Sequence, residues 1–224
     1  MFKKLEVRGK FLGYTFEQPH AFCFFGSRHV GKEDLKIYFP QLDFVFLKQV
    51  HGDQVIQATG EQNLEADGHF TTKKGLALVS QSADCIPILL MAENQVCALH
   101  AGWRGIAAKI VLASSQKISS IPKTALIGPH IRKASFEVGT DVASKILAAK
   151  PEGSSNEEFL GEHSEPGKQR LDLTAIARGQ LNTTFPGVEI LDTGNDTMTS
   201  LDFHSFRRDR DKAGRQYSFV VIKG

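Results

Sequence analysis

The sequence predicts a single α+β domain in which mixed β-sheets form a central sandwich flanked by helices. Short apolar segments dominate the first half of the 224 residues, and helical patterns lie mainly in the second half. Each short segment is bounded by Gly, Pro, Asn or charged residues, as strands usually are. Strands followed by interspersed helices are typical of sheets covered by helices, so we expect one domain over residues 1–224.

The expected strands follow the order of these apolar segments. They cover residues 22–25, 44–50, 55–58, 76–80, 86–91, 96–100 and 124–127. Side chains alternate between the two faces of a strand, so His100 shares a face with Val96 and Ala98, and Cys97 points the other way. We therefore expect Cys97 to be a core residue that does not reach any site containing His100.

Three helices are expected. The first covers residues 103–118, where Ile106, Ile110 and Val111 form an apolar stripe. A second begins near Thr140-Asp141, and a third covers residues 173–181 after Asp172, a favourable N-cap residue. Residues 151–170, rich in Gly, Ser, Glu and Pro, are interpreted as a surface excursion. Residues 203–222 are interpreted as a hairpin with a charged turn at 207–215.

Composition argues against several classes of protein. The apolar fraction of 41% and the charged fraction of 23% are ordinary for a globular chain, and a net charge of +2 gives no support for a nucleic-acid partner. No segment approaches the roughly 18 uncharged apolar residues of a membrane helix. The N-terminus lacks the apolar region of a signal peptide. Three cysteines at irregular spacing do not resemble a disulfide framework. We expect a cytoplasmic protein with reduced thiols that binds neither nucleic acid nor membranes.

Three side chains at the ends of predicted strands are candidates for a metal site. His51 follows the predicted strand 44–50, Cys85 directly precedes the strand 86–91, and His100 ends the strand 96–100. Imidazole and thiolate both bind zinc, and three protein ligands leave one position open, as in catalytic zinc sites. Their spacing matches no local zinc signature, so the pattern alone favours buried core histidines and an inert thiol over a metal site.

The same residues allow a second chemistry. Cys85 would act as a nucleophile whose proton is taken by His100 or His51, with Asp84 orienting the base. That arrangement would make the protein a cysteine hydrolase or amidase. A thiolate bound to a metal is not a free nucleophile, so metal analysis separates the two hypotheses.

Other polar segments carry weaker signals. Asp67-Gly68-His69 is interpreted as a turn, and Gly128-Pro129-His130 as a rigid turn that lines the site. Arg207, Arg208, Arg210 and Arg215 suggest phosphate or nucleic acid, but most of them are interpreted as a solvated hairpin tip, because Asp209 and Asp211 offset part of their charge.

A series of short motifs runs along nearly the whole chain in one order. The motifs are Lys48-Gln49-Val50-His51-Gly52, Ala66-Asp67-Gly68, Ser82-Ala83-Asp84-Cys85-Ile86-Pro87, His100-Ala101-Gly102-Trp103-Arg104-Gly105, Ile127-Gly128-Pro129-His130-Ile131, Phe136-Glu137-Val138-Gly139, Leu171-Asp172-Leu173, Ser205-Phe206-Arg207-Arg208-Asp209 and Gly214-Arg215-Gln216. Together they resemble the polyphenol oxidase or laccase-domain family, also described as metal-dependent purine nucleoside phosphorylases.

The resemblance implies that His51, Cys85 and His100 are both the metal ligands and the catalytic residues. The implied metal is zinc, with copper as the alternative. The implied reaction is phosphorolysis of adenosine, inosine and S-methyl-5'-thioadenosine, with some adenosine deamination, so the partners are purine nucleosides and phosphate. Arg28, which resembles the family's N-terminal arginine, and Arg104 are expected at the substrate. A homodimer is compatible with the resemblance.

The sequence departs from the family's pattern at three places. Ser135 stands where the family often has Cys, and Asp196-Thr197 stands where Cys-Thr is frequent. Val30-Gly31-Lys32 replaces the usual Gly-Gly after the arginine, which affects the role expected of Arg28. Fewer soft ligands speak against a copper-dependent phenol oxidase, which stays open as an alternative beside the cysteine hydrolase and a non-enzymatic interaction module.

Overall fold

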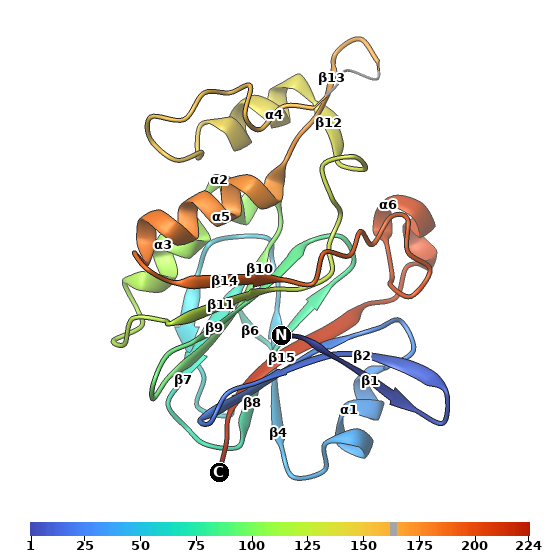
Figure 1. Ribbon diagram of the computed structural model, residues 1–224, viewed down its shortest axis with the longest axis vertical. Helices are drawn as coiled ribbons and strands as arrows, with labels where there is room; N and C mark the ends of the chain where they lie inside the picture. The colour runs from blue at the N-terminus through green and yellow to red at the C-terminus, as the bar shows by residue number, and fades with distance from the viewer. Residues whose placement is uncertain (162–164) are drawn as a thin grey trace.

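Two β-sheets pack face to face, and helices cover the outer side of each (Figure 1). The computed structural model describes residues 1–161 and 165–224. The larger sheet has seven strands in the order β1 (Lys3–Val7), β2 (Lys10–Glu17), β3 (Ala21–Gly26), β15 (Gln216–Ile222), β8 (Leu76–Ser82), β4 (Asp43–Lys48) and β6 (Leu64–Glu65). The other has six, in the order β14 (Glu189–Asp192), β11 (Thr124–Ile127), β9 (Ile86–Met91), β10 (Val96–Ala101), β7 (Gly68–Thr71) and β5 (Val55–Gln57). The predicted sandwich of mixed sheets is confirmed.

The helices lie outside the sandwich. Three of them, α2 (Trp103–Ala107), α3 (Ile110–Ser115) and α5 (Leu173–Thr184), cover the six-stranded sheet, and α1 (Lys32–Tyr38) covers the seven-stranded sheet (Figure 1). Beyond α2 and α5 lie α4 (Thr140–Leu147) and a small sheet of β12 (Glu137–Gly139) and β13 (Lys168–Arg170). No helix of the described chain has the length and apolar character that a membrane span requires.

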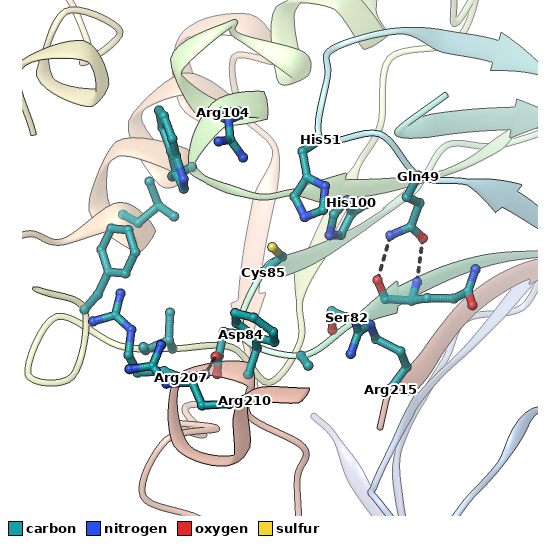
Figure 2. A pocket seen from close by; sticks show the side chains of 17 residues that line it. Gln49, His51, Ser82, Asp84, Cys85, His100, Arg104, Arg207, Arg210 and Arg215 are labelled. Atoms are coloured by element: carbon teal, nitrogen blue, oxygen red, sulfur yellow. Dashed lines mark hydrogen bonds between the residues drawn. The ribbon is translucent and has the colours of Figure 1, made fainter. Parts of the chain in front are cut away.

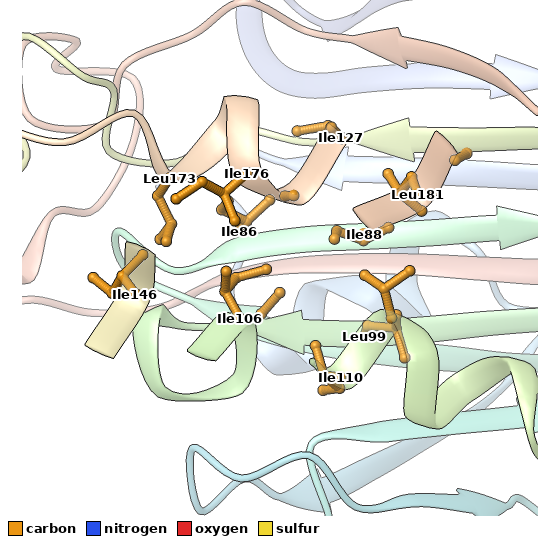
Figure 3. Packing of buried hydrophobic residues seen from close by; sticks show 14 of the residues in the cluster. Ile86, Ile88, Leu99, Ile106, Ile110, Ile127, Ile146, Leu173, Ile176 and Leu181 are labelled. Carbon is orange, nitrogen blue, oxygen red and sulfur yellow. The ribbon is translucent and has the colours of Figure 1, made fainter. Parts of the chain in front are cut away.

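Alternation along the strands divides the apolar core into three layers. In β9, Ile88 packs against the helices of the six-stranded sheet, whereas its neighbour Leu89 packs between the two sheets. In β3, Phe25 lies between the sheets and Phe24 packs on the side of α1. Figure 3 shows the helix-side layer, where isoleucines and leucines of the strands meet those of α2, α3, α4 and α5. Consecutive apolar residues are needed here because both faces of these strands are buried.

The first predicted helix is two helices in the structure. Lys109, between α2 and α3, has a φ of 60° in the left-handed region, which interrupts the helical path. Ile106 and Ile110 are nevertheless both fully buried in the same layer. The apolar spacing therefore continues across the break and hides it from the sequence pattern. The predicted helices at α4 and α5 are confirmed, and Asp172 caps α5 by accepting a hydrogen bond from Ala175 N at 2.8 Å.

The predicted C-terminal hairpin is wrong. Residues before the charged segment do not form a strand; instead α6 (Phe206–Asp209) begins after Ser205, whose hydroxyl accepts a hydrogen bond from Arg208 N at 3.2 Å. A 3-10 helix, η1 (Arg210–Lys212), follows. The last strand, β15, pairs with β3 and β8 in the middle of the seven-stranded sheet. Part of the surface excursion predicted at 151–170, residues 162–164, lies outside the described residues.

Candidate functional site

Antiparallel pairing places Cys85 beside His100. Strand β10 pairs with β9 so that His100 lies opposite Pro87, and Cys85 directly precedes β9. The end of one strand and the start of the other therefore meet at the same edge of the six-stranded sheet. His100 is almost fully buried there, and Cys85 is partly buried.

His51 reaches the same edge from the other sheet. It follows β4, and the side chain of Gln49 extends the pairing of β4 with β8. The amide nitrogen of Gln49 donates to Gln81 O at 2.7 Å, and its amide oxygen accepts from Gln81 N at 2.8 Å. His51 itself has a φ of 63°, an uncommon conformation for a residue with a side chain. The turn is thus held against β8 by backbone and side chain together.

Asp67 is a buried carboxylate that joins the two histidines. One oxygen accepts hydrogen bonds from Val50 N at 3.1 Å and Gly52 N at 2.6 Å, and the other accepts from His51 N at 2.9 Å. Its Oδ1 also lies 2.8 Å from Nδ1 of His100. Since Nδ1 is engaged, Nε2 is the ring nitrogen of His100 that is free to bind a ligand. Carboxylates commonly orient metal-binding histidines in this way.

The two imidazoles and the thiol converge. The ligand atoms of His51, Cys85 and His100 all lie within 4.8 Å of one another, and the two rings are 4.9 Å apart at an interplanar angle of 78°. Gly102 makes room for them: a Cβ there would lie 3.0 Å from the Cys85 sulfur and 3.3 Å from Cδ2 of His51. Two imidazoles, one thiolate and an orienting carboxylate fit a zinc ion by the chemistry of the donors.

The surroundings favour a thiolate at Cys85. Burial alone would raise the pKa of this thiol, but the charge and hydrogen bonds of His100 and His51 outweigh burial and lower the pKa to about 6. For His100, burial acts to lower the pKa, and the opposing effects of Cys85 and Asp67 raise it to about 9. Each partner therefore stabilises the charged form of the other. A thiolate is the form that binds a metal or attacks as a nucleophile.

These residues lie in a cavity of about 640 Å³. Figure 2 shows His51, His100 and Arg104 on one side of it and Arg207, Arg210 and Arg215 on the opposite side, with Cys85 and Asp84 between them. An apolar wall completes the cavity, formed by Trp103, Ile131, Phe136, Leu173 and Phe206. The cavity thus offers a metal-ligand set, a positively charged side and an apolar surface.

The two arginines expected at the substrate lie in different places. Arg104 lines the cavity, with its guanidinium 4.7 Å from the ring centre of Trp103. Arg28 is exposed, donates from Nη1 to Leu201 O at 3.4 Å, and is not among the described residues that line the cavity. Its role at the substrate stays a prediction.

Asp84 does not orient the histidine, in contrast to the arrangement expected for a cysteine nucleophile. Its carboxylate accepts from the hydroxyl of Thr197 at 2.7 Å and from Arg207 N at 2.6 Å. The carboxylate that orients His100 is Asp67. Interpreting Asp67-Gly68-His69 as a simple turn was wrong: β7 begins at Gly68, and the Asp67 carboxylate bonds the 50–52 backbone and His100.

The charged segment also differs from its interpretation as a solvated turn. Asp209 bonds the guanidinium of Arg208 through two hydrogen bonds of 2.8 Å each, so it neutralises Arg208 alone. Arg207, Arg210 and Arg215 face the cavity. Counting charges along the sequence favoured a solvated tip because it does not show which arginine each aspartate contacts.

The turn at Gly128-Pro129-His130 contributes Ile131 to the cavity and not its histidine. His130 is fully buried, and its two ring nitrogens lie 2.7 Å from Gly128 O and 2.6 Å from the hydroxyl of Thr174. Burial lowers its pKa to about 4, so the ring is neutral. His130 therefore stabilises the fold. Cys97 is likewise a core residue on the helix side of β10, as predicted.

The chain matches known proteins over most of its length. The family described as multi-copper polyphenol oxidoreductase laccase matches residues 30–223. The purine nucleoside phosphorylase YfiH of Shigella flexneri is 32% identical over 189 residues, which cover 80% of this chain and 73% of that protein. The purine nucleoside phosphorylase RC0672 of Rickettsia conorii is 34% identical over 189 residues, covering 80% of this chain and 76% of that protein.

Solved structures agree with this relationship. The crystal structure of protein NMB0706 from Neisseria meningitidis superimposes with a TM-score of 0.80 at 25% identity and covers 100% of this chain and 99% of that one. YlmD from Geobacillus stearothermophilus shares the fold, with a TM-score of 0.82 over 92% of this chain and 93% of that one. The sequence matches and the shared fold together show that the chain belongs to the multi-copper polyphenol oxidoreductase laccase family, some of whose members are named purine nucleoside phosphorylases.

Proposed function

We propose that the protein is a metal-dependent purine nucleoside phosphorylase whose active site is the cavity at His51, Cys85 and His100. The observation that carries this proposal is the convergence of these three side chains in a cavity with one apolar and one cationic wall. A volume of about 640 Å³ is in the usual range for small-molecule sites, about 300–1,000 Å³. The names of relatives that are 32% and 34% identical supply the reaction.

The proposed substrates are adenosine, inosine and S-methyl-5'-thioadenosine, with adenosine deamination as a side activity. In phosphorolysis, an oxygen of phosphate forms a bond to C1' of the ribose while the bond from C1' to the purine nitrogen breaks. The electron pair of that bond passes to the purine, which takes up a proton. The products are the free base and ribose 1-phosphate, or 5-methylthioribose 1-phosphate when S-methyl-5'-thioadenosine is the substrate.

The residues of the cavity would divide this work between them. The apolar wall, including Phe136 and Leu173, offers a surface for the purine and keeps water from the reacting bond. Asp67 holds His100 in one orientation, and Gly102 leaves the space that Cys85 and His51 need. A zinc ion held by the three ligands would supply Lewis-acid chemistry, and copper is the alternative metal.

A second candidate function has its own supporting observation. Cys85, His100 and Asp67 form a chain of a thiol, an imidazole and an orienting carboxylate, as cysteine hydrolases require. In that function Cys85 would attack a carbonyl carbon and His100 would carry the proton. The protein would then work without metal, and alkylation of Cys85 would abolish its activity.

The test is a reaction of purified protein of measured zinc content with adenosine, with and without phosphate. We expect adenine and ribose 1-phosphate to form only when phosphate is present. Removing zinc with a chelator should abolish both products, and restoring zinc should bring them back. His29→Ala, at an exposed histidine away from the cavity, serves as a control that keeps full activity. Formation of inosine from adenosine, with or without phosphate, would identify a deaminase instead. No nucleoside product from the zinc-loaded protein would contradict the proposal.

A further inference from the structure

We propose that Arg207, Arg210 and Arg215 form the binding site for inorganic phosphate in this cavity. This inference rests on the proposed function, because phosphorolysis requires phosphate beside the nucleoside. It differs from the expectation drawn from the sequence, which placed Arg28 and Arg104 at the substrate. The three arginines come from one short segment that contains α6 and η1 and approach the cavity from the side opposite His51 (Figure 2).

The cavity carries an excess of positive charge. Four arginines line it, and Asp84 is the one carboxylate among its described lining residues. That carboxylate already accepts hydrogen bonds from the Thr197 hydroxyl and from Arg207 N. Within the ranges 1–161 and 165–224, the arginines that form ion pairs are Arg132, Arg178 and Arg208. The cavity arginines therefore lack an anionic partner, which a phosphate dianion would provide.

Two of the three guanidinium groups are held in place and still have free donors. Arg207 donates from Nη1 to Glu137 O at 2.8 Å, and its guanidinium carbon lies 6.0 Å from the ring centre of Phe136. Arg215 donates from Nη1 to Gly214 O at 2.8 Å and to Ala213 O at 3.2 Å. A guanidinium has five N–H donors, so each group keeps an Nε–H and an Nη2 that can bind two oxygens of one phosphate.

Arg210 is the unrestrained member of the group. Its side chain makes no hydrogen bond or ion pair to any described residue, although it lines the cavity. Its backbone has a φ of 52°, which is uncommon for a residue with a side chain. Arg210 is therefore free to close on a bound anion.

The segment is anchored to the residue that precedes Cys85. Arg207 N bonds the side chain of Asp84, the residue before Cys85, so the positively charged side begins next to the thiolate. Arg208 secures the rest: it is paired with Asp209, and its Nη1 donates to Thr197 O at 2.7 Å and its Nη2 to Phe203 O at 2.8 Å. One arginine thus has a structural role, and three are left for a ligand. The arrangement would hold phosphate beside a ribose that lies over Cys85.

The test compares Arg210→Met, Arg207→Met and Arg215→Met with Lys212→Met as the matched control. Lys212 lies in the same segment, is exposed and does not line the cavity. Inorganic phosphate binding to the zinc-loaded protein is measured by calorimetry without nucleoside, and the KM for phosphate is measured with adenosine. We expect each arginine variant to weaken phosphate binding by about tenfold or more and to raise the KM for phosphate equally, with the control unchanged.

The outcomes separate this inference from the proposed function. Phosphate binding that none of the three substitutions weakens would overturn the inference, and phosphorolysis with an unchanged phosphate KM would do so while the proposed function stands. If the arginine substitutions weaken phosphate binding but the unmodified protein does not phosphorolyse adenosine, the inference is supported and the proposed function is contradicted. Arg210→Met removes no hydrogen bond or ion pair to a described residue, so we expect this variant to fold, and thermal unfolding checks all three.

Discussion

The two sides of the cavity are built in different ways. His100 and Asp67 are buried at the ends of strands of the sandwich, and both oxygens of the Asp67 carboxylate accept hydrogen bonds from other residues of the protein. The arginines on the opposite side come from a short segment outside both sheets, and two of them, Arg210 and Arg215, are exposed. The difference indicates that one side is preorganised for a metal or a reacting group, whereas the other is left open for an anion that arrives and leaves.

The largest effect is expected from removing the thiolate on the rigid side. Cys85→Ser removes the strongest soft ligand, so we expect loss of bound zinc and a fall in phosphorolysis of more than about 100-fold, beyond the effect usual for residues that only orient ligands. Zinc content by elemental analysis and the rate of adenine release measure it. Cys97→Ala is the matched control, because Cys97 lies on the helix side of the same region and should leave zinc bound. Full zinc content in Cys85→Ser would show that the metal binds elsewhere.

The next effect concerns the carboxylate behind the histidines. Asp67→Asn keeps the size of the side chain but replaces one acceptor oxygen by a donor, which faces the backbone N–H groups of residues 50–52 or the His100 ring. We expect zinc affinity to fall by about 10–100-fold, measured by competition with a chelator. Thermal unfolding of the metal-free protein should also occur at lower temperature. Unchanged zinc affinity would mean that His100 does not depend on Asp67 for its orientation.

Acid should destabilise the buried side through His69. This residue follows Asp67 on β7, is almost fully buried, and burial lowers its pKa from 6.5 to about 3. The unfolded chain binds a proton below pH 6.5 and the folded chain does not, so stability is complete above that pH and declines as pH falls toward 3. At pH 5 the expected loss is about 2 kcal/mol relative to pH 7.5.

His69→Leu tests that assignment. Denaturant unfolding at the two pH values should show a smaller loss in the variant, by about the same 2 kcal/mol, because leucine cannot take up a proton. His130 also has a lowered pKa and remains in the variant, so some acid sensitivity persists. Equal losses in the two proteins would place the proton uptake at another group.

The same contrast explains how much could be predicted from the sequence. Strand-end residues such as His51, Cys85 and His100 stood out because each adjoins an apolar segment, and alternation correctly separated Cys97 from His100. The arginines suggested phosphate, but the sequence could not show which of them face the cavity. That depends on Asp209 pairing with Arg208 and on Ser205 starting a helix where a strand was expected. Contacts that join segments distant in sequence, such as Asp67 with His100, have no local pattern.

The smallest effect is expected where the two sides join. Asp84 has a φ of 91° and links the residue before Cys85 to the arginine segment through Arg207 N and the Thr197 hydroxyl. Asp84→Asn keeps one acceptor and removes the charge, so we expect the KM for phosphate to rise by about 2–10-fold as Arg207 becomes less firmly placed. The carboxylate does not contact His100, so zinc content should not change.

The KM for phosphate and the zinc content of Asp84→Asn should be measured on one preparation, because together they test whether the two sides of the cavity are independent. A higher phosphate KM with full zinc content would mean that the arginine side can be loosened without disturbing the ligands, as expected of two separately anchored sides. Ser135→Ala is the matched control, because Ser135 bonds Asp196, next to Thr197, but does not line the cavity. Loss of zinc in parallel with the rise in KM would contradict the separation, because Asp84 would then hold Cys85 and the arginines as one rigid unit.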